Sequence, residues 1–298
     1  DTHSAYLPQN SRFGKIGGYA TLEYYLNAER AKTPVSLYLD AGDQQTGSIF
    51  SSFSYADAIG GAVIKVFNYL HLDAATYGNH EFDYSHENTI KLRELANYPF
   101  ITTNILDEKN QPFGNMPYQI FSLDSLKIGI MGLTLTELPQ KVKRENITGL
   151  TILPYKEAID KYIEEVDKQS DLIILLTHNG LGADSLLATV LDNRIDLIIG
   201  GHSHTVISEP FQVNGIYIAS AGSYLNYLGA INIEVQNDRI SSYKSKLIPL
   251  IAPENLPPTP LNQFVKAIAD SLGKETGKVI AHIPVDWIPD KFKETAVS

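Results

Sequence analysis

Short runs of consecutive apolar residues, each bounded by polar ones, restrict the fold of this chain more than any other feature. Residues 171–177 and 195–199 are the clearest runs. A strand that is apolar on both faces is typical of a parallel sheet covered by helices. In residues 155–169, apolar side chains at offsets of 0, 3, 4 and 7 share one helical face. The alternation of strands and helices predicts an α/β domain.

The remaining elements follow from the same periodicities. Strands are predicted at residues 35–40, 72–77, 100–106 and 127–133, and helices at 56–70, 86–97 (capped by Ser85) and 183–191. Strands at 216–220, 230–235 and 240–250 are separated by short turns, which predicts that the α/β body closes with a β-meander.

Composition excludes several classes of function. The chain has 24 basic and 34 acidic residues and a net charge of −10, whereas proteins that bind nucleic-acid polymers rely on a basic surface. The absence of cysteine rules out disulfides, thiolate metal sites and cysteine nucleophiles. The apolar runs are far shorter than the roughly 20 residues that a transmembrane helix needs. We therefore expect neither a nucleic-acid partner nor a transmembrane segment.

Five of the eight histidines lie in four short polar segments, and a fifth polar segment has no histidine but contains two aspartates. The segments are residues 1–3, 40–43, 78–83, 177–180 and 200–204. All except the first directly follow a predicted strand. Ligands bind at the carboxyl ends of strands in α/β sheets, so we expect these segments to meet along one sheet edge.

The residue types in these segments suit two divalent cations. Imidazole and carboxylate groups bind Zn, Mn, Fe, Co or Ni, and the lack of thiols favours a catalytic over a structural site. Two ions about 3.5–4 Å apart need a bridging ligand, which a short Asp at a strand end can supply. Each segment alone has an ordinary explanation as a turn or a structural histidine. Their combination predicts metal binding.

The ordered set of these motifs resembles the calcineurin-like metallophosphoesterase family. It consists of Asp1-x-His3, Gly42-Asp43 with Gly47, Gly78-Asn-His-Glu81, His178 and Gly201-His-x-His204. Further features resemble the 5′-nucleotidase branch, namely Phe82-Asp83, Thr103-Asn104, the double Gly17-Gly18 and residues 199–205. The resemblance implies a four-layer αββα sandwich over residues 1–252, with a dinuclear metal site at the carboxyl ends of the strands.

The resemblance also implies a role for each motif residue. One metal is held by Asp1, His3 and His204, the other by Asn79, His178 and His202, and Asp43 bridges them. Many relatives have Gln where this chain has His204, which is still a metal-ligand type.

Three further roles concern the substrate. His80 is implied to contact the phosphoryl group and to help the leaving oxygen depart, with Asp83 orienting its ring. Asn79 and Asn104 are implied to touch the substrate, although a strand-end Asn that forms a turn explains Asn104 nearly as well. Glu81 is expected to support the loop. Tyr224 lies on a loop that borders the site in relatives, although core packing or a turn is the favoured role for it.

The implied function is hydrolysis of small phosphate monoesters, above all 5′-nucleotides. A hydroxide activated by two divalent cations, through a pKa lowered to about 7, attacks phosphorus. Three related activities stay open, those of a 2′,3′-cyclic nucleotide phosphodiesterase, a nucleotide pyrophosphatase and a thiosulfohydrolase-like enzyme. A metal-retaining binding protein without turnover is the non-enzymatic alternative.

The segments outside the motifs carry weaker expectations. Residues 253–298 are expected to form a Pro-rich linker, a helix at 261–272 that leads away from the body, and the start of a C-terminal nucleotidase domain, which residues 293–298 resemble. We also expect an apolar strand before Asp1 and a periplasmic or extracellular location. Asn146-Ile-Thr148 matches the glycosylation acceptor pattern.

Overall fold

A computed structural model describes residues 1–12, 14–33, 35–191, 193–209 and 211–276, and its centre is a six-stranded sheet. The strands follow the order β13-β14-β12-β11-β9-β8. Their bounds are β8 (Tyr118–Leu123), β9 (Leu126–Thr134), β11 (Leu172–His178), β12 (Leu197–Gly200), β13 (Phe211–Val213) and β14 (Ile216–Ala219). The four inner strands are parallel and the two edge strands are antiparallel, so the sheet is mixed.

Further strands form five small pairs. Strand β3 (Leu39–Asp40) pairs in parallel with β6 (Ala74–Ala75), and β15 (Tyr227–Val235) forms an antiparallel pair with β16 (Ile240–Pro249). The other pairs are β1 (Gln9–Ser11) with β2 (Gly14–Ile16), β4 (Ser54–Tyr55) with β5 (Ala58–Ile59), and β7 (Ile105–Leu106) with β10 (Thr151–Ile152). The predicted meander was wrong, because β14 joins the parallel sheet and, of the three strands predicted for it, only those that became β15 and β16 pair with each other.

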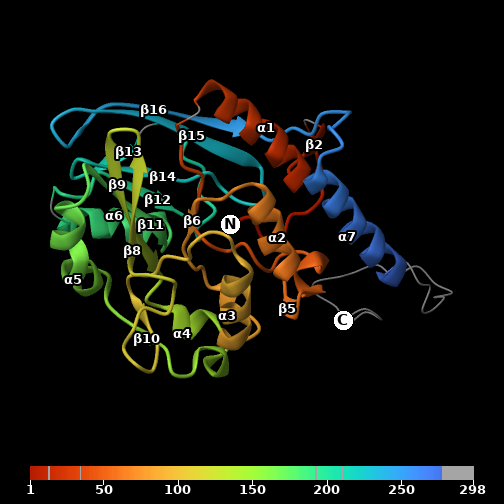
Figure 1. Cartoon of the computed structure of the whole chain (residues 1–298), viewed down its shortest axis with the longest axis horizontal. Coiled ribbons are helices and arrows are strands. Elements are labelled where there is room, and N and C mark those ends of the chain that lie inside the picture. The colour runs from red at the N-terminus through yellow and green to blue at the C-terminus, as the bar shows by residue number, and fades with distance from the viewer. Residues whose placement is uncertain (13, 34, 192, 210, 277–298) are drawn as a thin grey trace, which may run out of the picture.

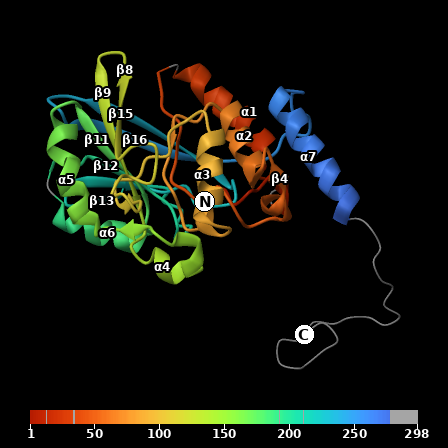
Figure 2. The same ribbon diagram turned by 60° about the horizontal axis from the view of Figure 1, so that its bottom comes forward.

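Helices flank the strands on two sides. They are α1 (Tyr19–Lys32), α2 (Gly61–Tyr69), α3 (His86–Leu95), α4 (Leu138–Lys141), α5 (Tyr155–Asp167), α6 (Leu181–Val190) and α7 (Pro260–Thr276), with 3₁₀ turns η1 (Ile49–Ser52), η2 (His80–Phe82) and η3 (Arg144–Ile147). Helices α5 and α6 lie on one side of the six-stranded sheet, and α1, α2 and α3 lie on the opposite side of the molecule (Figures 1 and 2).

Three clusters of apolar side chains fill the space between these elements. The first lies between the sheet and α5 and α6, and includes Met131 and Leu175. The second lies between the sheet and the strands β3, β6, β15 and β16, and includes Ile130 and Ile174. The third joins β6 to α1, α2, α3 and α7. Neighbouring residues of β9 and β11 thus belong to different clusters, which explains why these strands are apolar without alternation. The chain has a mixed α/β fold with a central mixed sheet.

Two predicted helices differ from the observed ones. The helix expected from residue 56 begins at Gly61, because Ala56 and Asp57 take left-handed conformations in the turn between β4 and β5. Helix α7 does not lead away from the body but packs on α1 and α2. Its buried Leu261, Val265 and Ile268 give it one apolar face that must be covered.

Two other expectations concern the ends of the chain and the membrane. The resemblance of residues 293–298 to the start of a nucleotidase domain falls outside the described residues. Among the described residues, no helix combines the length and the apolar character needed to cross a bilayer.

Candidate metal centre

The predicted ligands come together from two sheets, not along the single sheet edge that we expected. Loops after β3 and β6 contribute one part of the site, and the end of β11 and the loop after β12 contribute the other. Residues 1–3 lie beside them. The predicted residues brought close together are Asp1, His3, Asp43, His80, His178, His202 and His204.

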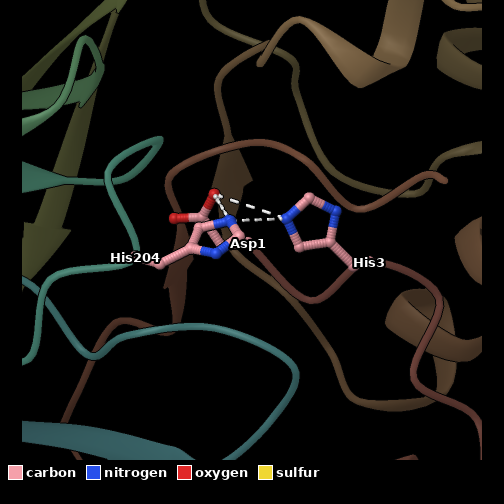
Figure 3. Close-up of side chains that lie close together, drawn as sticks. All are labelled: Asp1, His3 and His204. Carbon is pink, nitrogen blue, oxygen red and sulfur yellow. Dashed lines mark hydrogen bonds and ion pairs between the residues drawn. The ribbon is translucent and has the colours of Figure 1, made fainter. Parts of the chain in front are cut away.

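The first group of candidate ligands consists of Asp1, His3 and His204. The Nε2 atoms of His3 and His204 lie 2.8 Å apart. The Asp1 carboxylate lies 3.8 Å from the first and 3.5 Å from the second. Figure 3 shows that the three side chains point toward one another. Their three donor atoms therefore converge on one position.

The second group consists of Asp43, His178 and His202, whose donor atoms lie within 4.8 Å of one another. Oδ2 of Asp43 is 3.0 Å from Nε2 of His178 and 4.0 Å from Nε2 of His3. Asp43 therefore lies between the two groups, where a bridging ligand is needed.

Hydrogen bonds to backbone carbonyls orient two of the histidines. Nδ1 of His178 lies 2.8 Å from the carbonyl oxygen of Ala41, and Nδ1 of His3 lies 2.9 Å from that of Thr46. A carbonyl oxygen only accepts, so both rings carry their proton on Nδ1 and present a lone pair on Nε2. Such carbonyl contacts are typical of metal-binding histidines.

The electrostatics of the site keep the candidate ligands in their metal-binding forms. Burial lowers the pKa of His3 to about 4 and also lowers the pKa values of His202 and His204. Burial opposes ionisation of Asp43, but nearby positive charge outweighs it and holds that pKa below its ordinary value. Neutral imidazole and ionised carboxylate are the forms that bind cations.

Two buried atoms that can each donate a lone pair to a metal ion also indicate a metal site. Asn79 Oδ1 and His178 Nε2 are buried and have no hydrogen-bond partner among the described residues. An unsatisfied buried polar atom costs about 1–3 kcal/mol. Both atoms belong to the second predicted position, where one cation would give each of them a partner. Together with the first group of donors, the residues present fit a pair of divalent ions.

Glu81 joins two of the loops that carry the ligands. Its carboxylate accepts backbone N–H groups from Gly78 and Asp43 at 2.6 and 2.9 Å, and from Gln44 and Gln45 at 2.8 and 3.2 Å. A Cβ atom on Gly78 would overlap Asp43, so a side chain here would separate the two loops. Burial and the charge of Asp43 raise the pKa of Glu81 to about 6.

We expect Glu81→Gln to destabilise the protein by about 3 kcal/mol and to reduce metal affinity. The amide places an NH₂ group against N–H donors, and hydrogen bonds to a buried charge are worth about 1.5–3 kcal/mol. Urea unfolding of the metal-free protein measures the change. The same substitution at the exposed Glu87 is the control, with an expected change below about 0.5 kcal/mol. Equal stability of the two variants would contradict this role.

The backbone of the site is strained at several candidate ligands. His3, Asp43, His202 and His204 have φ values of 50°, 55°, 75° and 53°. Positive φ is uncommon outside glycine, and such residues cluster at functional sites.

Tyr224 belongs to the site, although the sequence favoured a packing or turn role for it. Its φ is 54°, and its ring stacks on His3 with centroids 4.8 Å apart. It also meets His204 edge-on at 5.8 Å. No motif spacing marks this residue, so the sequence indicated only that its loop lies near the site and not that its ring contacts the histidines.

His80 and Asp83 form a pair next to the ligands. His80 Nδ1 lies 2.6 Å from Asp83 Oδ2, and the His80 backbone N–H donates to Asp43 Oδ1 at 2.9 Å. Burial opposes the charged ring, but the hydrogen bond to Asp83 and the charge of Asp43 raise the pKa of His80 to about 9. The His80 side chain is 33% exposed, so a substrate can reach it.

Asn104 lies apart from this cluster of histidines. It is fully buried, its amide donates to the Thr134 carbonyl at 2.7 Å, and its Oδ1 accepts from the Thr134 N–H at 2.9 Å. These contacts match the structural role that the sequence left open. Its contact with substrate stays a prediction without support from the geometry.

A mixed α/β fold with clustered imidazole and carboxylate donors at strand ends defines a metal-binding α/β protein. The chain belongs to the calcineurin-like phosphoesterase family, whose profile matches residues 1–206. This membership confirms the resemblance drawn from the motifs.

Individual relatives resemble the chain over part of their length. The 5′-nucleotidase of Vibrio cholerae is 31% identical over 273 residues, which cover 80% of this chain and 49% of the relative. The human 5′-nucleotidase is 28% identical over 313 residues, covering 94% of this chain and 52% of the relative. The chain thus spans about half the length of these two relatives.

Solved structures show the same fold. A 5′-nucleotidase precursor from Thermus thermophilus superposes with a TM-score of 0.81 at 24% identity, covering 97% of this chain and 60% of its own. The sulfate thiohydrolase SoxB of the same organism also gives 0.81, at 23% identity, covering 88% of this chain and 48% of its own.

Proposed function

We propose that this chain is a dinuclear metal phosphoesterase that hydrolyses phosphate monoesters, with 5′-nucleotides as the substrate class. The observation that carries the proposal is the position of Asp43 between two groups of donors, directly beside the His80–Asp83 pair. The names of the relatives from Vibrio cholerae and human support nucleotides as the substrate.

We propose the four-layer αββα sandwich as the finer description of the fold. Three apolar clusters support it, because three buried interfaces separate four layers. Helices α5 and α6 then form one outer layer, and α1, α2 and α3 the other (Figure 1).

The protein's own residues have distinct tasks in this reaction. When bound, two cations supply an activated water and neutralise the phosphoryl oxygens. Asp83 holds Nδ1 of His80, which leaves Nε2 for contact with the substrate. The protonated ring donates from Nε2 to the leaving oxygen as the ester bond breaks. Because the chain carries a net charge of −10, an anionic substrate depends on these local positive groups.

A substrate panel tests the proposal against the alternatives. Metal-free protein is supplied with Mn²⁺, Zn²⁺ or Co²⁺ and incubated with AMP, 2′,3′-cyclic AMP, NAD, an aryl phosphate and an S-sulfonated thiol. We expect phosphate release from AMP and the aryl phosphate. Turnover of the S-sulfonated thiol alone would favour thiosulfohydrolase chemistry. This alternative is tested because the chain shares its fold with SoxB. Metal binding without any turnover would indicate a binding protein.

We expect Asp83→Asn to move the alkaline limit of activity to lower pH. Asp83 raises the pKa of His80, and a neutral amide lowers it again by roughly one to three units. Because the acid must carry its proton, activity then falls at lower pH than in the wild type. The pH profile of kcat/KM measures this limit. Asp124→Asn, on the distant β8–β9 turn, should leave the profile unchanged. If the alkaline limit of Asp83→Asn were the same as that of the wild type, the His80–Asp83 pair would have no part in proton transfer.

We also propose an exported location and a boundary near residue 252, both on the resemblance to the 5′-nucleotidase branch. Osmotic-shock fractionation tests the first. Limited proteolysis within the Pro-rich residues 253–260 tests the second.

A further inference from the structure

The His80–Asp83 pair lies on a short turn, and burial of these two side chains is not enough to fix it. The side chains of His80 and Asp83 are 33% and 27% exposed. The backbone of the turn is fixed from outside by side chains that donate to its carbonyl groups. The Thr89 hydroxyl donates to the Glu81 carbonyl at 2.6 Å. The Asn146 amide donates to the carbonyls of Phe82 and Asp83, both at 2.8 Å.

Asn146 is itself held firmly. It lies in η3, is 4% exposed, and its backbone N–H donates to the Lys143 carbonyl at 2.9 Å. The next residue, Ile147, is 7% exposed and belongs to the third apolar cluster. A fixed amide that binds two successive carbonyls therefore locks the backbone at Asp83, more than 60 residues away in sequence.

These contacts give another meaning to the sequence pattern Asn146-Ile-Thr148. An amide that is buried and donates to two carbonyls has no room for a sugar. In the folded chain the pattern serves structure and not glycosylation.

We propose that Asn146 is a positioning residue for the proton donor His80. This inference rests on the proposed function, because it presumes that His80 protonates the leaving group. Without the amide, two carbonyls, one of them in a buried contact, lose this donor and the turn relaxes. Asp83 then shifts, and with it the ring that it orients. Proton donation depends on hydrogen-bond geometry, so the loss falls on substrates whose leaving groups need a proton.

The test compares two aryl phosphates of similar size. p-Nitrophenyl phosphate has a leaving group that departs readily without a proton, whereas phenyl phosphate depends on one. The readout is the ratio of kcat for phenyl phosphate to kcat for p-nitrophenyl phosphate, measured with the metal-loaded protein. This ratio does not change when a variant merely contains less folded protein. We expect Asn146→Ala to lower it about tenfold, within the loss known for misplaced catalytic groups.

Matched variants make the comparison specific. Asn88→Ala removes another buried amide, one that bonds to the backbone of Ile59, and should leave the ratio unchanged. His80→Asn defines the ratio without the proton donor. Asn146→Ser, which keeps a short donor, replaces Asn146→Ala if the latter does not fold.

Hydrogen exchange of the metal-free protein supplies a readout that is independent of activity. In Asn146→Ala, exchange should rise at the amides of residues 80–84, and in Asn88→Ala at residues 56–62.

The outcomes separate this inference from the proposed function. A lowered ratio in both Asn146→Ala and His80→Asn supports the positioning role. A lowered ratio in His80→Asn alone overturns it and leaves the proposed function intact. An unchanged ratio in His80→Asn overturns the role of His80, and the inference falls with it.

Discussion

Replacing Asp43 by Asn is expected to leave the protein with fewer than two tightly bound divalent cations. Oδ2 of Asp43 lies between His178 and His3, so its charge acts on both positions. Asn has nearly the same size but no charge. The lost electrostatic stabilisation is several kcal/mol, which lowers turnover by about a hundredfold or more at tenfold per 1.36 kcal/mol. Metal analysis after dialysis, together with phosphate release, measures both effects.

Asp196→Asn is the matched control for this prediction. Asp196 is also a buried carboxylate that accepts a backbone N–H, from Ile173 at 2.9 Å, but it lies outside the donor groups. This variant should keep its full metal content. If Asp43→Asn retained two ions with unchanged affinity, the assignment of Asp43 as the bridge would be wrong.

His80→Asn is expected to keep both ions and to lower turnover by about 10²–10⁴, the range for a positioned proton donor. The His80 ring bonds to Asp83 through Nδ1, and its pKa is raised to about 9, which favours the protonated and non-coordinating form. The backbone N–H that contacts Asp43 remains in the variant, so the bridging ligand keeps this partner.

A second histidine serves as the control for His80→Asn. His86 begins α3 and pairs with Glu87 at 3.3 Å, outside the groups of candidate ligands. His86→Asn should keep both metal content and turnover. Loss of an ion from His80→Asn would place His80 among the ligands and contradict the proposed mechanism.

The sequence predicted the site best where residues of metal-binding type directly follow a predicted strand. Apolar runs predicted β11 and β12, and the polar residues that follow them predicted His178, His202 and His204 as neighbours. Gly42 and Gly78 stand where the loops of β3 and β6 touch, and a Cβ on Gly42 would overlap the backbone of Gly78. Such local constraints can be recognised from the types of residue and their spacing in the sequence.

Other features depend on packing that spacing does not reveal. Helix α1 was not predicted, because its N-cap Gly18 supplies no side-chain cap and its buried residues, from Tyr19 to Leu26, lie toward its N-terminal end. The meeting of two sheets at the site arises from tertiary packing. The contacts of Tyr224 with His3, and of Asn146 with the turn at Asp83, join segments that no motif connects.

Metal content and position, determined together, test the central claim most directly. The protein is loaded with Mn²⁺ or Zn²⁺, the ions per chain are counted, and anomalous scattering from a crystal locates them. We predict two ions, one among Asp1, His3 and His204 and the other among Asn79, His178 and His202, with Asp43 between them. A single ion, or ions bound elsewhere, would contradict the dinuclear centre.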